Sequence, residues 1–438
     1  MADFGISLQW QQAQDPDLLT QETSAYMRVN VDGICLTRCE DVWSHTVRED
    51  TLVSAYPLAL WLATSWWRLN HEPLPDSPGT VWRQTHELAG AGNGYVWPSI
   101  LFAPDGEYVN IWASPLQVAG QSVSELAWLN QPAIIPVSQF QNEAQKVIEE
   151  VLGRLSALGH AENDLKTVWN LVRSERRDSD LSRRRILEAR LGFDPEECPP
   201  AVLDQMFGLQ IQTGEEALFE LAPVLGHSPQ KVPENLVALT EARGLRGQFK
   251  LPALGNASNV SAPSAIPWQR GNEAARLLRE GLSNTAEPLS DKALFELVGL
   301  TANAIEGFGY KRNLTTIVRP SDGGSCDFVL RKPHPLARRF ELARLIGDHI
   351  MASQPPSGSR WLVSADTATA IQKRQRAFAA EFLCPFDALK EYLDGDFSES
   401  TQEAAACHFQ VSEKTVESIL ANHEVIPRPA PPFFPYAA

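Results

Sequence analysis

The chain has 438 residues, of which 43% are hydrophobic and 21% charged, a balance typical of a folded globular protein. This length suits two or three domains, and neither disorder nor a fibrous repeat is indicated. The formal net charge of −16 argues against a general nucleic-acid binder, because a negative field repels phosphate. We expect protein partners, and we do not expect nucleic acid as a partner.

The sequence also bears on the compartment. The N-terminal stretch MADFGISLQW lacks the basic start and apolar run of a signal peptide. The longest apolar stretch, residues 55–63, contains Pro57 and is too short to cross a bilayer. Six scattered cysteines are typical of reduced thiols. We therefore expect a cytoplasmic protein that contacts no membrane and needs no cofactor.

Residues 1–130 are rich in tryptophan, with nine of the twelve in the chain. The pattern predicts two β-hairpins, which turn at Asp32-Gly33 and at Pro104–Gly106, and a mostly buried helix after Pro57 within residues 55–69. We expect a Trp-rich α+β domain here.

Three of these tryptophans, Trp61, Trp66 and Trp67, fall on the predicted helix at separations that do not share one face. We therefore expect part of the set to pack on another domain or to be exposed to a partner.

Residues 131–250 predict a helical connector, because apolar residues recur three and four apart between Gly and Pro breaks. Arg183, Arg184 and Arg185 form a candidate basic patch there. Neighbouring acidic residues favour a solvated face with internal ion pairs. Residues 251–267, small, polar and Pro-punctuated, predict a linker.

The region 268–426 predicts helices on a small sheet. Its expected elements are, in order, a helix WQRGNEAARLLREGL, a helix DKALFELVGL, the strands TTIVRP and CDFVLR joined by SDGGS, a helix RRFELARLIGDHI, a helix IQKRQRAFAAEFLCP and the helical EAAACHFQVSEKTVESIL.

Four local patterns occur in this region in a fixed order: PWQRGNEAARLLR, RRFxLAxxxG, RxxxFAAxFLxP and AAxxFxVSxxTVxxxL. Together they resemble the ImmA/IrrE-type metallopeptidases, and the resemblance implies a zincin-like fold. Members of that family carry H-E-x-x-H on one helix, where two histidines bind zinc and the glutamate activates water. A third ligand, a glutamate, lies on the next helix.

This sequence departs from the family at all four of those positions. Alignment of the flanking residues places Arg344 and Asp348 at the histidines, Leu345 at the catalytic glutamate and Gln372 at the third ligand. A guanidinium has no usable lone pair for zinc, and leucine is no base. We expect no metal and no catalytic residue. An ion pair between Arg344 and Asp348, with Gln372 accepting a hydrogen bond from Arg344, is expected to fill the zinc position.

Other interpretations of this domain remain open. If the side chains of Arg344 and Asp348 are exposed to solvent and do not pair with each other, they would line a cleft that recognises a ligand or peptide. A relocated zinc site would draw on Asp348, His349, Glu381, Cys384 and His408, and would make the protein a metallopeptidase that cleaves a repressor-like protein. Residues 404–420 have a helix-turn-helix pattern, which indicates a DNA-binding transcriptional regulator as an alternative function. Glu413 and Glu417 on the second helix disfavour contact with DNA.

Two further stretches carry candidate residues. His86 and Glu87 begin a zinc-like motif that Gly90 interrupts, so a helix end is the better interpretation. The tail 427–438 is Pro-rich and offers the aromatic residues Phe433, Phe434 and Tyr436 for docking. From the resemblance we expect a non-catalytic regulatory or scaffolding protein, a sensor or adaptor in antiviral (antiphage) defence or in a stress response.

Overall fold

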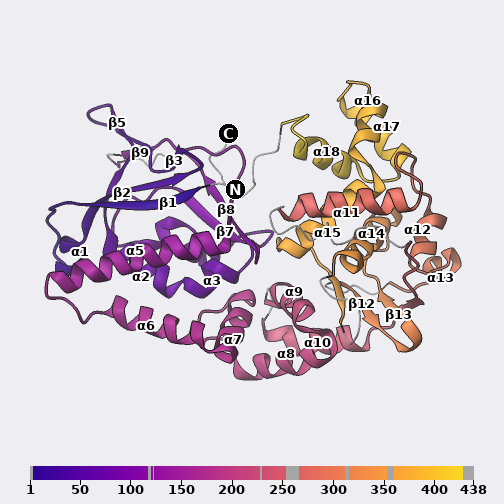
Figure 1. Ribbon diagram of the computed structural model, residues 1–438, viewed down its shortest axis with the longest axis horizontal. Helices are drawn as coiled ribbons and strands as arrows, with labels where there is room; N and C mark the ends of the chain where they lie inside the picture. The colour runs from indigo at the N-terminus through magenta and orange to yellow at the C-terminus, as the bar shows by residue number, and fades with distance from the viewer. Residues whose placement is uncertain are drawn as a thin grey trace. The chain divides into compact units, whose positions relative to one another are not determined.

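A computed structural model describes residues 3–116, 120–121, 123–226, 229–252, 266–310, 315–352 and 360–427 (Figure 1). The described chain forms two compact units that divide between Pro199 and Pro200. We call them the N-terminal unit and the C-terminal unit. Both combine helices with small antiparallel sheets, so the expected mixture of α and β structure is confirmed.

Within the described residues, the strands of the N-terminal unit pair as antiparallel sheets of the orders β1-β2-β3 with β6 on β2, β10-β8-β7, and β5-β4-β9. Their bounds are β1 Phe4–Trp10, β2 Ser24–Val31, β3 Ile34–Cys35, β4 Cys39–Asp41, β5 Thr46–Arg48, β6 Thr51–Ser54, β7 Ile100–Pro104, β8 Tyr108–Ala113, β9 Val123–Glu125 and β10 Ala133–Pro136.

Both predicted hairpins are present. The first pairs Val31 with Ile34 across Asp32 and Gly33, whose φ angles of 51° and 77° suit a tight two-residue turn. The second pairs Pro104 with Val109. Turn residues at fixed positions therefore determined both strand pairings.

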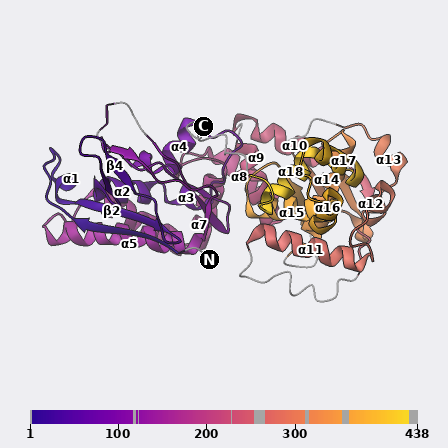
Figure 2. The ribbon, with the colours of Figure 1, turned by 90° about the horizontal axis from the view of Figure 1, so that it is seen from above.

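The helices of the N-terminal unit bury one face against these strands or against one another. Their bounds are α1 Leu18–Glu22, α2 Ala55–Thr64, α3 Trp66–His71, α4 Thr80–His86, η1 Leu88–Ala91, α5 Val137–Ala157, α6 Asp164–Arg177 and α7 Ser179–Arg190. Figures 1 and 2 show α5 running along the strands β1 and β2.

The predicted connector 131–250 is helical, but the boundary of the two units falls inside it. Helices α5, α6 and α7 belong to the N-terminal unit. Phe140 of α5, for example, packs its ring 5.2 Å from that of Phe102. The helical stretch over residues 164–190 breaks at Asp178, whose side chain accepts hydrogen bonds from the backbone N–H groups of Asp180 and Leu181.

The C-terminal unit is built on an antiparallel sheet of order β11-β13-β12-β14. Its strands are β11 Leu245–Gly247, β12 Thr316–Pro320, β13 Cys326–Val329 and β14 Leu362–Ser364. The β12–β13 hairpin turns through η4 Asp322–Gly324, where Gly323 and Gly324 both have positive φ. This is the hairpin that the sequence predicted.

The helices of the C-terminal unit gather around that sheet (Figure 1). Their bounds are α8 Pro200–Thr213, α9 Glu215–Gly226, η2 Pro229–Lys231, α10 Val232–Glu241, α11 Pro267–Gly281, α12 Asp291–Leu297, α13 Ala302–Glu306, α14 Pro335–Met351, α15 Ala370–Leu383, α16 Phe386–Leu393, α17 Glu399–Phe409 and α18 Glu413–Asn422.

Helices α14 and α15 approach closely at a glycine. A Cβ atom added to Gly347 would lie 2.5 Å from Cγ of Phe378, which is fully buried. The motif residues Gly347 and Phe378 therefore serve as a packing contact.

Among the described residues, no helix is both long enough and apolar enough to cross a membrane.

Candidate functional site

The residues that align with the metallopeptidase site lie on one buried surface between α14 and α15. Helix α14 begins with Pro335 at its first turn, and α15 begins at Thr369, whose hydroxyl accepts a hydrogen bond from the backbone N–H of Gln372. Arg344 is 3% exposed, Asp348 5%, and both Leu345 and Gln372 are fully buried. These four side chains are therefore withdrawn from solvent.

Arg344 joins α14 to α15. Its Nη2 donates to Oε1 of Gln372 at 2.5 Å and also to the backbone oxygen of Ala365. Its Nη1 lies 3.7 Å from the Oδ1 atom of Asp366. Burial, reinforced by Arg376, lowers the pKa of Arg344 to about 9, so the guanidinium remains a cation at pH 7.

Gln372 uses its whole side-chain amide. Its Oε1 accepts from Arg344 and from the backbone N–H of Ala365 at 2.8 Å. Its Nε2 donates to the backbone oxygen of Val363 and to Oε2 of Glu220, each at 2.9 Å. An amide offers two donors and one acceptor oxygen with two lone pairs. Gln372 therefore has no lone pair left for a metal ion.

Glu220 on α9 completes the network. The carboxylate is 3% exposed, and its Oε2 accepts from the Thr369 hydroxyl at 2.5 Å as well as from Gln372. A segment 152 residues before Gln372 in the chain thus covers the start of α15. We call Arg344, Gln372, Glu220, Thr369 and Ala365 the buried network.

Asp348 does not pair with Arg344, so that part of the sequence prediction is wrong. Its Oδ1 lies 3.9 Å from Nη2 of Arg360, which in turn lies 2.8 Å from Oε2 of Glu216. Burial raises the pKa of Asp348 to about 7. Arg344 and Asp348 do not pair because their side chains point toward different partners. The Arg344 side chain extends toward residues 365–372, whereas the Asp348 side chain, one turn later on α14, faces Arg360. The predicted hydrogen bond from Arg344 to Gln372 is confirmed.

Leu345, which the sequence motifs lead us to expect at the position of a general base, belongs to the hydrophobic core with Leu342, Ala343 and Ile346. It offers no group that could accept a proton.

The structure does not bring the ligands of a relocated zinc site together. His349 stacks on Phe249, Glu381 pairs with Arg276 at 2.8 Å, and Cys384 is buried in the core. His408 stacks on Tyr392. In the part of the chain that the structure describes, no group of three or more His, Cys, Asp or Glu side chains is arranged to hold a metal ion.

The three candidate tryptophans are buried inside the N-terminal unit. Trp61, Trp66 and Trp67 are 6%, 2% and 3% exposed. Trp66 packs at 5.1 Å on Trp169, and the Trp67 indole N–H donates to Glu175 at 2.8 Å. Both contacts come from α6, which lies beyond residue 130 but belongs to the same N-terminal unit, so the expected packing on another domain is not found. These positions offer no surface to a partner, contrary to the other half of the expectation.

One of the three arginines of the candidate basic patch, Arg185, is buried. Arg185 is 4% exposed and pairs with Glu175 and Glu188, both at 2.7 Å, and with Glu196. Arg184 lies 3.7 Å from Glu188, and Arg183 is half-buried. Of these three arginines, Arg185 is therefore a structural residue and not part of a basic surface.

The remaining candidates have structural surroundings or cannot be placed. His86 is fully buried and stacks on Trp82 at the end of α4. Helices α17 and α18 form the expected helix pair, and Ala405, Phe409, Val416 and Leu420 pack into the core of the unit. Phe433, Phe434 and Tyr436 lie outside the described residues.

Comparisons with family models, with curated proteins and with solved structures yield no match to this chain.

Sequence reasoning missed Glu216, Glu220, Arg360 and Asp366, which supply charged partners to the site. Glu220 carried a weak signal, since it is an acidic residue on the otherwise apolar stretch ALFELAPVL of a predicted helix. A charge at such a position requires a buried partner.

Proposed function

We propose that this protein is a non-catalytic regulatory or scaffolding protein whose C-terminal unit is a pseudo-peptidase of the ImmA/IrrE type. One observation carries the proposal. At the positions where that family binds zinc, Arg344 donates to Gln372, and Glu220 covers Gln372 from α9. A permanent cation and a saturated amide stand where metal ligands would be needed.

The packing frame around the site supports the same proposal. Phe378, Ala379, Leu342, Ala343 and Gly347 agree with the family pattern and are buried in the core. The frame is thus retained while the four chemical positions are changed. A domain that keeps its packing residues but lacks the residues for catalysis is better suited to binding a partner than to cleaving a peptide. A sensor or adaptor in antiviral defence or in a stress response is the role that the resemblance favours.

Peptidase activity is the first test. The full chain, purified without a tag, is incubated with and without added zinc on denatured casein and on a repressor-like protein substrate. We expect no cleavage that a chelator abolishes. Chelator-sensitive cleavage that is lost in Asp348→Ala would instead establish the relocated metallopeptidase.

DNA binding is tested separately by a mobility-shift assay at physiological salt. We expect no sequence-specific shift, since α18 begins with Glu413 and the chain carries a net charge of −16. A specific shift that is lost on changing exposed residues of α18 would replace the proposal with a transcriptional regulator. Capture of a partner from the native host then identifies what the protein binds.

A further inference from the structure

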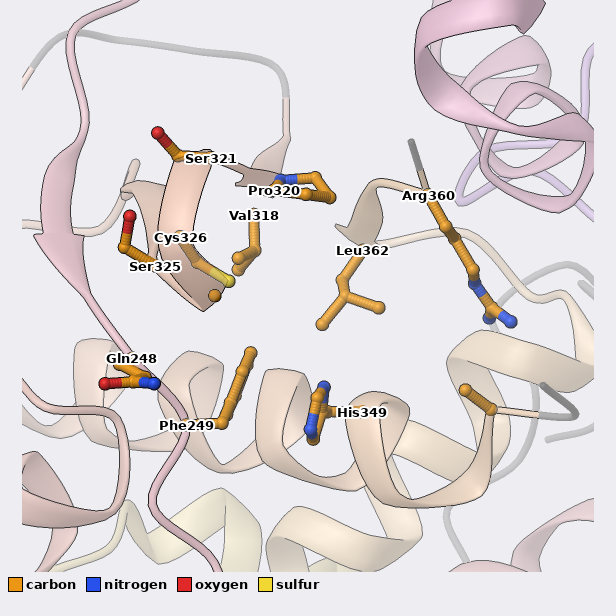
Figure 3. Close-up of a pocket in the computed structure, with 12 residues that line it drawn as sticks. Gln248, Phe249, Val318, Pro320, Ser321, Ser325, Cys326, His349, Arg360 and Leu362 are labelled. Carbon is orange, nitrogen blue, oxygen red and sulfur yellow. The ribbon is translucent and has the colours of Figure 1, made fainter. Parts of the chain in front are cut away.

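The C-terminal unit contains a cavity of about 350 Å³, bounded by the β12–β13 hairpin, the start of β14 and the end of α14 (Figure 3). This volume lies within the range of small-molecule sites, about 300–1,000 Å³. Figure 3 shows Val318, Cys326 and Leu362 directed from the strands toward Phe249 and His349. The middle of the cavity is therefore apolar.

Aromatic rings form the wall opposite the strands. The imidazole of His349 stacks on Phe249 with ring centroids 4.0 Å apart and planes 12° apart. Burial, with Arg360 nearby, lowers the pKa of His349, so the ring is neutral near pH 7. A neutral imidazole offers one donor and one acceptor. Neither nitrogen has a hydrogen-bond partner within the described chain.

The rim adds neutral polar groups. The side chains of Gln248 and Ser321 belong to the cavity lining, and neither is hydrogen-bonded in the described part of the protein, but the Ser321 hydroxyl is directed away from Phe249 and His349 in Figure 3. The Gln248 amide and the His349 ring together present both donors and acceptors. A purely aliphatic occupant would desolvate these groups without replacing their hydrogen bonds, at about 1–3 kcal/mol for each group.

Arg360 is the charged residue among those that line the cavity in the described structure, and its guanidinium lies 2.8 Å from Glu216 and 3.9 Å from Asp348. The carboxylate of Glu216 offsets this cation. Neutral ligands are thus favoured over carboxylates and phosphates.

We propose that this cavity binds a small, uncharged aromatic heterocycle. Its ring packs between the strand residues Val318 and Leu362 and the rings of Phe249 and His349, and its polar edge bonds to His349 and Gln248. The inference does not depend on the absence of zinc. The pseudo-peptidase proposal and this one can therefore fail independently.

Cys326 supplies a reporter for occupancy. The half-buried thiol lines the cavity, whereas Cys407 on α17 is exposed and outside it. The full chain is treated with a maleimide, and the modification rate of each cysteine is followed by mass spectrometry of its peptide. Adenine and quinazoline are the neutral probes, and benzoate is the anionic control.

We expect the neutral probes to slow modification of Cys326 about tenfold at ten times their dissociation constant, and to leave Cys407 unchanged. His349→Phe keeps a ring on Phe249 but removes the donor and acceptor, and should abolish that protection. His408→Phe, at a stacked histidine outside the cavity, is the matched control and should retain it. Thermal unfolding of both variants verifies folding.

Three results would overturn the proposal: no protection by either neutral probe at millimolar concentration, equal protection by benzoate, or unchanged protection in a folded His349→Phe variant. The first result would refute binding of uncharged aromatic heterocycles to the cavity. The second would refute the preference for neutral ligands, and the third would refute the role of His349 in bonding to the polar edge of the ligand.

Discussion

Nη2 of Arg344 and Oε1 of Gln372 lie 2.5 Å apart and hydrogen-bond α14 to α15, at two of the positions that our proposal assigns to the zinc ligands of a metallopeptidase. The bond is buried and belongs to a network that also includes Glu220 of α9. Breaking one member of such a network leaves the others unsatisfied, which gives it measurable consequences.

Replacing Arg344 by histidine should destabilise the C-terminal unit by about 1–3 kcal/mol and create no activity, because Gln372 and Ala365 lose a charged donor. Urea unfolding measures the change. Arg338→His is the control on the same helix: Arg338 is half-buried and donates to the Tyr310 hydroxyl. If Arg344→His lowers the free energy of unfolding no more than Arg338→His does, the buried network contributes little to stability.

Restoring the family glutamate at Gln372 alone should also be destabilising. The Gln372→Glu side chain would lose both Nε2 hydrogen bonds and place a carboxylate against Glu220, at a cost of about 1–3 kcal/mol. Adding Glu220→Gln should recover part of the loss, because an amide at position 220 donates to the new carboxylate. The free energies of unfolding of the two single variants and the double variant measure this coupling. If the effects of the two substitutions on the free energy of unfolding are strictly additive, residues 220 and 372 do not interact.

The buried carboxyl of Asp348 predicts a pH dependence. Its pKa is raised to about 7, above the ordinary value of 3.8, so the folded protein holds a proton that the unfolded chain releases. Stability should therefore fall as pH rises from about 4 to about 7, by about 2–4 kcal/mol from this group. Asp348→Asn removes the titration. The stability difference between this variant and the natural chain should grow over that interval and then level off, whereas a difference that is independent of pH would refute the prediction.

Two helical glycines in different surroundings should respond oppositely to alanine substitution. Gly347 lies where α14 packs closely on α15, and Gly153 of α5 is the uncrowded control. Gly347→Ala should be destabilising, because the new methyl group would meet Phe378 at 2.5 Å. Gly153→Ala in α5 should stabilise by about 0.5–1 kcal/mol, since no atom lies within 4 Å of its added methyl and alanine favours helix. Thermal unfolding distinguishes the two, and stabilisation by both would mean that α14 and α15 are farther apart.

Local signals made much of the fold predictable. The turn at Asp32-Gly33 is read within a few residues, and the hairpin followed from it. The Arg344–Gln372 contact, between residues 28 apart in the chain, was expected because the resemblance to a metallopeptidase places both residues at one site. Contacts distant in sequence were not readable in this way. Glu220 and Arg360 could not be assigned to the site, because nothing in the sequence determines which helix covers the start of α15. The same limit explains the error at Asp348, where helical spacing allowed an ion pair that Arg360 takes instead.

The most direct test of the filled site is the zinc content of the full chain. The protein is purified without a tag, incubated with excess zinc, dialysed, and measured by inductively coupled plasma mass spectrometry. Because Arg344 and Gln372 have no free lone pair for a metal, the account predicts far less than one zinc ion per chain, unchanged in Asp348→Ala. One tightly bound zinc ion per chain that is lost in Asp348→Ala or Gln372→Ala would contradict it.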